Sequence, residues 1–203
     1  MDKTSFSHKD VNVVDRKVVY NGFFKMEQVR LKHRLFAGGW SATLSRELFV
    51  RGSAVAAIVY DPRLKVIGMV EQFRIGLVDA SEKEASPWCL EVVAGMSEPS
   101  ETPEEVMLRE LHEEAGVTPE KLVFICDYYS SPGGTSENLH LYCAIADLSE
   151  AGGLFGLAEE GEDIRFVALP EDEVFSSLYS GRYNNAATLI CLQWLQMHRH
   201  TLC

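Results

Sequence analysis

An α/β fold with a mixed sheet is the fold class that this sequence predicts, and three observations predict it. Apolar stretches of strand length recur along the chain, other stretches carry helical periodicity, and the two kinds follow one another in a mixed order. Elements in such an order are typical of a mixed sheet with helices on its faces. The first part of the chain contains strand-like stretches alone. We therefore expect a small N-terminal antiparallel β-sheet unit, residues 1–50, followed by an α/β domain, residues 51–203.

The composition and charge of the chain limit its partners. It has 203 residues, of which 46% are hydrophobic and 24% are charged, which is ordinary for a globular protein with a sizeable core. The formal net charge of -11 argues against nucleic acid or an anionic membrane surface as partner. An anionic small molecule remains a candidate substrate if a cation screens its charge.

Cysteine usage and hydropathy indicate the compartment. The five cysteines are odd in number and show no CxxC spacing, so neither a zinc site nor a disulfide framework is expected. The start of the sequence does not read as a signal peptide, and we find no apolar run of membrane-spanning length. We expect a cytoplasmic protein.

Apolar and polar residues alternate through residues 1–50, with turn signals at Asn21-Gly22 and Gly38-Gly39. This pattern predicts three antiparallel strands. A sheet of this size is not stable unless it packs on something else. The residues leave open whether it packs on a partner subunit or on its own chain.

The α/β domain is expected to begin with two paired strands that turn at Pro62-Arg63. A polar loop then leads to one apolar strand, WCLEVVAG, which runs directly into a helix. Beyond the helix, strands are expected in LVFICDYY, LHLYCAIADL and IRFVAL, and helices in PEDEVFSSLYSGRY and NNAATLICLQWLQMHRH.

The helix that follows WCLEVVAG has clear boundaries. Thr102 and Glu105 form a capping box, Pro103 suits the first helical position, and Gly116 supplies a stop. At about 100° per residue, the helix has an apolar arc and an acidic arc. The apolar arc holds Met107, Leu108, Leu111 and Ala115, and the acidic arc holds Glu110, Glu113 and Glu114. Because like charges at this spacing repel, the acidic arc is either a solvated face or a cation site.

Nine residues in and around this helix favour the cation site. They are Gly95, Glu101, Arg109, Glu110, Leu111, Glu113, Glu114, Gly116 and Val117. They match every fixed position of the Nudix box, so the chain resembles the Nudix hydrolases. The resemblance implies an α/β/α sandwich whose loop–helix–loop binds divalent cations and hydrolyses a diphosphate linked to another group.

The metal ligands follow partly from chemistry and partly from this resemblance. Glu110 and Glu114 lie one helical turn apart, and Mg²⁺ prefers carboxylate oxygens. The resemblance adds the backbone carbonyl of Ala94 and the side chain of Glu162, and it implies roughly two or three Mg²⁺ ions, with Mn²⁺ as a substitute. Glu113 is expected as a further ligand or as an acid behind the ligands. Arg109 is expected to pair with Glu101 or a neighbouring acid and to hold the box in shape.

The general base is expected in the acidic stretch GLAEEGEDIRF. Its acids either form a solvated surface or lie on a mobile loop that brings one carboxylate to the attacking water. The resemblance aligns Glu160 with the base. The residues alone do not separate Glu160 from Glu159.

The substrate class is suggested by Pro132, which lies 16 positions beyond Gly116 in the loop Ser-Pro-Gly-Gly-Thr-Ser-Glu. This loop resembles that of the bacterial ADP-ribose pyrophosphatases within the family. The resemblance implies hydrolysis of ADP-ribose to AMP and ribose 5-phosphate. The alternative substrates are GDP-mannose and other nucleoside diphosphate sugars, and the alternative to an enzyme is a catalytically inactive sensor of the same ligand.

The same resemblance implies a homodimer that exchanges the N-terminal sheet and so completes the substrate site. Adenosine contacts are expected from the N-terminal unit and from two residues of the catalytic domain, although Phe23 could equally be a core residue. The loop around Pro132 is expected near the terminal ribose. The implied contacts are Phe23, Phe24, Arg46, Glu47, Arg51, Arg74, Met96, Ser131, Pro132, Gly133 and Glu137.

Overall fold

A computed structural model describes residues 6–80, 85–97 and 100–202. The contacts divide the chain into two compact units. The first unit is Met1–Gly52 with Tyr129–Glu137, and the second is Ser53–Tyr128 with Asn138–Cys203. Of the helices in the described part of the chain, none has the length and apolarity that crossing a membrane requires.

The first unit is a three-stranded antiparallel sheet in the order β1-β2-β3. Its strands are β1 (Val11–Asn21), β2 (Lys25–His33) and β3 (Leu44–Val50). Gly38 and Gly39 turn the chain between β2 and β3 with φ of 92° and 77°, values that side chains other than glycine rarely adopt. The prediction of three antiparallel strands is confirmed.

A loop from the later part of the chain binds this sheet. The segment Tyr129–Glu137 contacts β3 by a short parallel bridge between Phe49 and Thr135. The Phe49 N–H donates to the Gly134 carbonyl at 2.8 Å, and the Phe49 carbonyl accepts from the Ser136 N–H at 3.1 Å. The loop that contains Pro132 is therefore held by the N-terminal sheet.

The second unit is built on an eight-stranded sheet, in which β4 and β9 are parallel and the other registered pairs are antiparallel. The strands follow the order β10-β11-β5-β4-β9-β8, while β6 pairs with β5 and β7 pairs with β4. Their bounds are β4 (Ser53–Asp61), β5 (Val66–Phe73), β6 (Trp88–Glu91), β7 (Val93–Met96), β8 (Lys121–Tyr129), β9 (Asn138–Ile145), β10 (Gly153–Phe155) and β11 (Ile164–Pro170).

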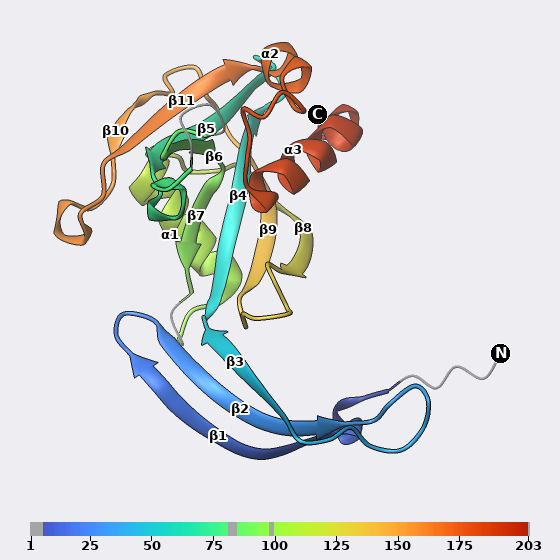
Figure 1. The fold of residues 1–203 in the computed structure, drawn as a ribbon. Coiled ribbons are helices and arrows are strands. Elements are labelled where there is room, and N and C mark those ends of the chain that lie inside the picture. The colour runs from blue at the N-terminus through green and yellow to red at the C-terminus, as the bar shows by residue number, and fades with distance from the viewer. Residues whose placement is uncertain (1–5, 81–84, 98–99, 203) are drawn as a thin grey trace. The chain divides into compact units, whose positions relative to one another are not determined.

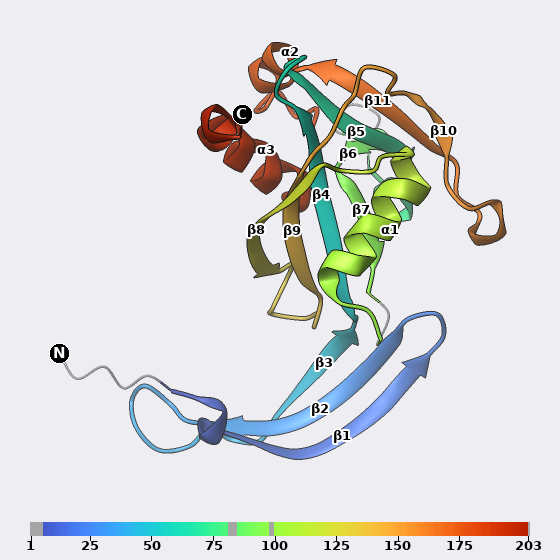
Figure 2. The ribbon, with the colours of Figure 1, turned by 180° about the vertical axis from the view of Figure 1, so that it is seen from behind.

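Helices cover both faces of this sheet, as Figures 1 and 2 show. The helices are α1 (Pro103–Ala115), α2 (Glu171–Ser176) and α3 (Ala186–His198). Alternate residues of β4 belong to two separate cores because side chains of a strand point to opposite faces. Val55, Ala57 and Val59 join the core that includes Met107 and Leu111 of α1. Ala56, Ile58 and Tyr60 join the core that includes Leu192 and Leu195 of α3. The predicted α/β/α sandwich with a mixed sheet is confirmed.

The apolar stretch WCLEVVAG is two strands, and the prediction of one strand is wrong. Its first half, β6, pairs with the end of β5, and its second half, β7, pairs with the start of β4. β4 and β5 pair with each other over only three residues each, at 59–61 and 66–68. Because β4 and β5 diverge beyond that point, the chain changes partner at Val92, whose N–H donates to Thr188 Oγ1 at 3.2 Å.

Two further expectations differ from the structure. Leu108 was expected in the apolar arc of α1, but it is 45% exposed. The buried arc of the helix instead includes Val106 and Glu114 beside Met107, Leu111 and Ala115. The expected helix PEDEVFSSLYSGRY is helical only over α2, and the short strand β10 was not predicted.

Candidate active site

The box helix α1 begins as its sequence predicts. The Thr102 hydroxyl accepts the Glu105 N–H at 3.3 Å, and the Glu105 carboxylate accepts the Thr102 N–H at 2.8 Å. At the other end, Gly116 has φ of 63° and its N–H donates to the His112 carbonyl at 3.0 Å. Both ends of the helix are thus capped locally, which fixes the part of the chain on which the acids lie.

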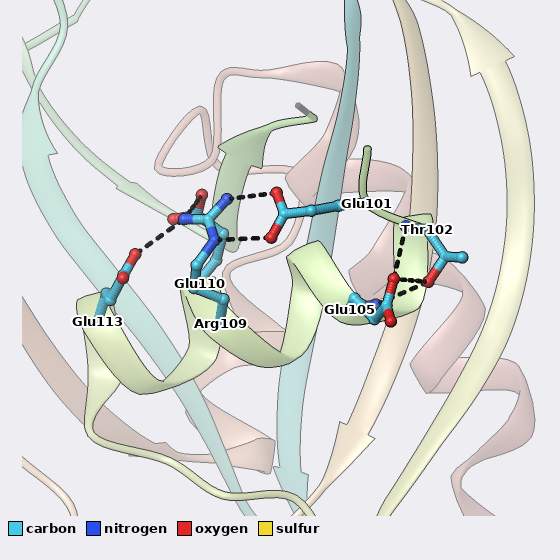
Figure 3. A network of polar contacts seen from close by, with 6 residues as sticks. All are labelled: Glu101, Thr102, Glu105, Arg109, Glu110 and Glu113. Atoms are coloured by element: carbon cyan, nitrogen blue, oxygen red, sulfur yellow. Dashed lines mark hydrogen bonds and ion pairs between the residues drawn. The ribbon is translucent and has the colours of Figure 1, made fainter. Parts of the chain in front are cut away.

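Arg109 holds three acids of the box together (Figure 3). Its Nη1 donates to Glu110 Oε1 and to Glu113 Oε2, each at 2.9 Å. Its Nε and Nη2 lie 3.4 Å from the two oxygens of Glu101. Burial opposes the charge of Arg109, but the hydrogen bond to Glu101 and the charges of Glu110 and Glu113 outweigh burial and raise its pKa above the ordinary value. Arg109 was predicted to pair with Glu101 or a neighbouring acid, and it pairs with Glu101, Glu110 and Glu113.

Gly95 provides the space for Glu110. A Cβ at position 95 would lie 1.9 Å from Glu110 Oε1 and 2.0 Å from its Cδ. Any side chain at this position would therefore displace the Glu110 carboxylate. Burial raises the pKa of Glu110, and the neighbouring Arg109 charge works in the opposite direction.

Glu114 lies on the buried side of α1 and is only 2% exposed. Its Oε2 accepts the backbone N–H of Ala94 at 3.0 Å, so the side chain and the segment before Gly95 are in direct contact. Burial raises the pKa of Glu114 to about 8, and the negative charges of Glu110 and Glu162 add to the rise. The Ala94 N–H and the charge of Arg74 act in the opposite direction without cancelling it.

The acidic loop brings Glu162 near these carboxylates, since its charge raises the pKa of both Glu110 and Glu114. Glu162 Oε2 accepts the Leu157 N–H at 3.1 Å, and the Gly156 N–H donates to the Glu113 carbonyl at 3.2 Å. The start of the acidic loop is therefore hydrogen-bonded to the end of α1. Glu160 makes neither of these hydrogen bonds; it is exposed on the 3-10 turn Ala158–Glu160, and Glu159 is exposed beside it.

The chemistry of these side chains suits a divalent cation. Within residues 6–80, 85–97 and 100–202, no three acidic, histidine or cysteine side chains already form a metal-binding group. Arg109 engages Glu110, and the Ala94 N–H engages Glu114. Even so, the charge of Glu162 raises the pKa of both Glu110 and Glu114, and the charge of Glu110 raises the pKa of Glu114. A cation would relieve that repulsion. Oxygen donors of this kind are those that Mg²⁺ and Mn²⁺ select.

Arg74 follows β5 and is bound by a residue that we did not single out from the sequence. Its Nε donates to Glu91 Oε1 at 2.6 Å, and Glu91 Oε2 accepts from Asn185 Nδ2 at 3.1 Å. Glu91 is 7% exposed, and its burial raises its pKa despite the charge of Arg74. The sequence signal that could have identified Glu91 is that it is the single acid within the apolar stretch WCLEVVAG.

The first unit groups several of the expected adenosine and ribose contacts. The Arg51 guanidinium lies over the Phe24 ring at 4.8 Å, and its Nη2 pairs with Glu137 at 2.9 Å. The Ser136 hydroxyl also accepts the Arg51 N–H at 2.9 Å. The buried Nε of Arg51 has no hydrogen-bond partner among the described residues.

The remaining expected contacts lie on the surface of their units. Phe23 is 87% exposed, so it is not a core residue of the sheet. Met96 is 46% exposed at the end of β7. The others are exposed as well, namely Arg46 and Glu47 on β3 and Ser131, Pro132 and Gly133 at the tip of their loop.

This fold and box identify the class of protein. The sequence profile described as the NUDIX domain matches residues 50–187, which is more than half of the chain. The chain belongs to the Nudix family. Nudix hydrolases generally act with divalent cations, in agreement with the donor set around α1.

Within the Nudix family, the chain is similar to pyrophosphatases of nucleoside diphosphate derivatives. The chain is 41% identical over 193 residues to the ADP-ribose pyrophosphatase of Haemophilus influenzae, covering 95% of this chain and 89% of that protein. It is 29% identical over 184 residues to the GDP-mannose pyrophosphatase of Pectobacterium atrosepticum, covering 90% and 92%. A solved structure described as an ADP compounds hydrolase shares the fold, with a TM-score of 0.71, 19% identity and coverage of 98% of both chains.

Proposed function

We propose that the chain hydrolyses the diphosphate of ADP-ribose and releases AMP and ribose 5-phosphate. The observation that carries the proposal is the intact acidic box, in which Arg109 orders Glu101, Glu110 and Glu113 around a glycine that leaves room for Glu110. The ADP-ribose pyrophosphatase at 41% identity supports the choice of substrate.

In the proposed reaction, the oxygen of a water molecule bonds to one phosphorus and the bridging P–O bond on that phosphorus breaks. Glu160 accepts the proton that the water loses, and its exposed position on a short turn suits a group that must reach the substrate. Glu110, Glu114, Glu162 and the Ala94 carbonyl would hold the cations, with Glu113 behind them. Arg109 keeps the carboxylates in position.

The proposed cofactor is Mg²⁺, with Mn²⁺ as a substitute and roughly two or three ions in the site. When bound, such ions neutralise the charge of the diphosphate and lower the pKa of the attacking water. The buried Glu114 and the half-buried Glu110, whose charge raises the pKa of Glu114, support this assignment.

We also propose that the N-terminal unit, residues 1–50, forms a homodimer by exchange of its sheet and contributes substrate contacts. The exposure of β1 supports this, because every residue of the strand is exposed, including Val13, Val14, Val18, Val19 and Tyr20 at 47–60%. Apolar surface of this kind is typical of interfaces. Arg51, stacked on Phe24 and paired with Glu137, is a candidate for a substrate contact.

Hydrolysis of GDP-mannose is the second candidate. The GDP-mannose pyrophosphatase supports it at lower identity, 29%. The cytoplasmic location remains a prediction from the sequence.

The experiment that tests the function is a hydrolysis assay of the purified protein with Mg²⁺ and a panel of nucleoside diphosphate derivatives. ADP-ribose should give AMP with the highest kcat/KM, and chelation of the cation should abolish the activity. Release of GMP from GDP-mannose at a higher kcat/KM would favour the second candidate. Tight binding of ADP-ribose without turnover would favour a sensor instead.

A further inference from the structure

The buried acid Glu91 connects Arg74 to the start of α3. Glu91 is the last residue of β6, and each of its two oxygens has one partner: Arg74 Nε at 2.6 Å and Asn185 Nδ2 at 3.1 Å. The carboxylate thus joins a residue that follows β5 to a residue that begins α3. Among the described residues, this is the only hydrogen bond of the Arg74 guanidinium.

Asn185 is itself fixed by the helix that it caps. Its Oδ1 accepts the Thr188 N–H at 2.9 Å, and this leaves the Nδ2 of the same amide to donate to Glu91. Two more contacts bind the same strand region to the start of α3. The Thr188 hydroxyl accepts the Val92 N–H at 3.2 Å, and the Cys89 thiol lies 3.6 Å from Asn184 Oδ1. Asn185 is therefore a rigid donor.

The direction in which the Arg74 guanidinium points matters for substrate binding, because Arg74 lies near Glu114 of the acidic box. Its charge is one of the charges that act on Glu114. Since the hydrogen bond to Glu91 uses Nε, the end of the planar guanidinium that carries the two terminal nitrogens remains able to donate to a ligand. A long side chain that is 43% exposed would otherwise lose considerable rotamer freedom when it meets a ligand.

We infer that Glu91, held by Asn185, is a positioning residue that orients Arg74 for a phosphate or ribose oxygen of the substrate. The inference rests on the proposed function and on the substrate contact that the sequence resemblance implies for Arg74. Glu91 does not touch the substrate in this arrangement, and it acts through Arg74 alone. A merely structural ion pair would instead affect folding without affecting recognition.

The test is a double-mutant cycle on the full-length enzyme with ADP-ribose and Mg²⁺. Glu91→Gln keeps the shape of the side chain and removes its charge. We expect KM to rise about tenfold with kcat nearly unchanged, since a charge-assisted contact is lost. In the Arg74→Ala background, the same substitution should change KM by less than about twofold. An equal rise in both backgrounds, or no rise in either, would overturn the inference.

Two further variants separate positioning from stability. Asn185→Ser keeps a good helix cap but loses the donor to Glu91, so KM should rise by about threefold with little change in Tm. Glu171→Gln is the matched control, because Glu171 is also a buried glutamate, paired with Arg199 at 3.8 Å and bound by Tyr60 at 2.7 Å. It should lower Tm and leave KM unchanged. A rise in KM for Glu171→Gln equal to that for Glu91→Gln would contradict a specific role of Glu91.

A second measurement does not depend on turnover. The Nε–H of Arg74 should give a slowly exchanging signal in ¹⁵N NMR spectra of the free protein, because it donates to a buried carboxylate. Glu91→Ala, which removes both acceptor oxygens, should abolish this protection, and Asn185→Ser should weaken it. Unchanged protection in Glu91→Ala would refute the inference. If ADP-ribose is not hydrolysed at all, the proposed function fails, while this signal still decides whether Glu91 holds Arg74.

Discussion

The carboxylate of Glu110 occupies the space that a side chain at Gly95 would fill, with Oε1 only 1.9 Å from where a Cβ would be. These residues lie on β7 and α1, 15 positions apart in the chain. Their contact brings a helix acid against the strand that also carries Ala94. The Nudix box therefore requires glycine at this position because the Glu110 carboxylate approaches it closely. Its backbone conformation does not require glycine, since Gly95 is not among the glycines with positive φ.

Gly95→Ala should move Glu110 and disable catalysis while the fold persists. We expect kcat/KM for ADP-ribose to fall by about 100-fold or more, since a displacement of about 1 Å in a catalytic constellation has that effect. The measurement is steady-state kinetics with Mg²⁺. Gly76→Ala is the matched control, because a Cβ there meets nothing within 4 Å, and its activity should be unchanged. Full activity of Gly95→Ala would refute the role of this contact.

Glu114 should make the stability of the metal-free protein depend on pH. Burial raises its pKa from 4.5 to about 8, so between these values the folded state binds a proton that the unfolded state releases. Stability is therefore greatest below pH 4.5 with respect to this group, and it falls as the pH rises towards 8. The Tm should drop by on the order of 5 to 10 °C across this range.

The Glu114→Gln variant provides the comparison for this effect. It should lose most of the pH dependence of Tm, and saturating Mg²⁺ should raise the Tm of the unmodified protein at pH 8 more than that of the variant. Its turnover of ADP-ribose should fall by about 1,000-fold or more if the carboxylate holds a cation. Equal Mg²⁺ stabilisation of both proteins would rule Glu114 out as a ligand.

Glu160→Gln should separate binding from chemistry. Because Glu160 is exposed on its turn and is assigned to proton transfer alone, KM should stay nearly constant while kcat falls by about 10²–10⁴-fold. Glu159→Gln, which alters the neighbouring exposed acid, should leave kcat within about twofold. If the two variants exchange these effects, Glu159 is the base.

Substitutions in β1 should test the dimer. Val18 and Val19 are 47% and 51% exposed and lie where the register of β1 against β2 shifts by one residue. The double variant Val18→Glu/Val19→Glu places two charges on this apolar surface and should halve the molecular mass measured by light scattering. Lys17→Glu, which changes the charge without altering an apolar residue, should remain dimeric. A monomeric unmodified protein would contradict the exchanged sheet.

Much of the fold could be predicted because its signals are local. The three N-terminal strands, the capped helix α1 and the mixed sheet with helices on its faces follow from alternation, capping residues and element order. The split of WCLEVVAG could not be predicted in this way. Its two halves are equally apolar, and only the divergence of β4 and β5 determines which strand each half pairs with.

The sequence by itself determined that Arg109, Glu110, Glu113 and Glu114 lie together, because these are set by spacing along one helix. Only the tertiary structure decided that Glu114 is buried against Ala94, that Leu108 is exposed, and that Glu91 joins Arg74 to Asn185. The physical reason is that burial and ion pairing depend on which distant segments meet. Local spacing specifies which side chains share a helix face, but it does not specify what that face packs against.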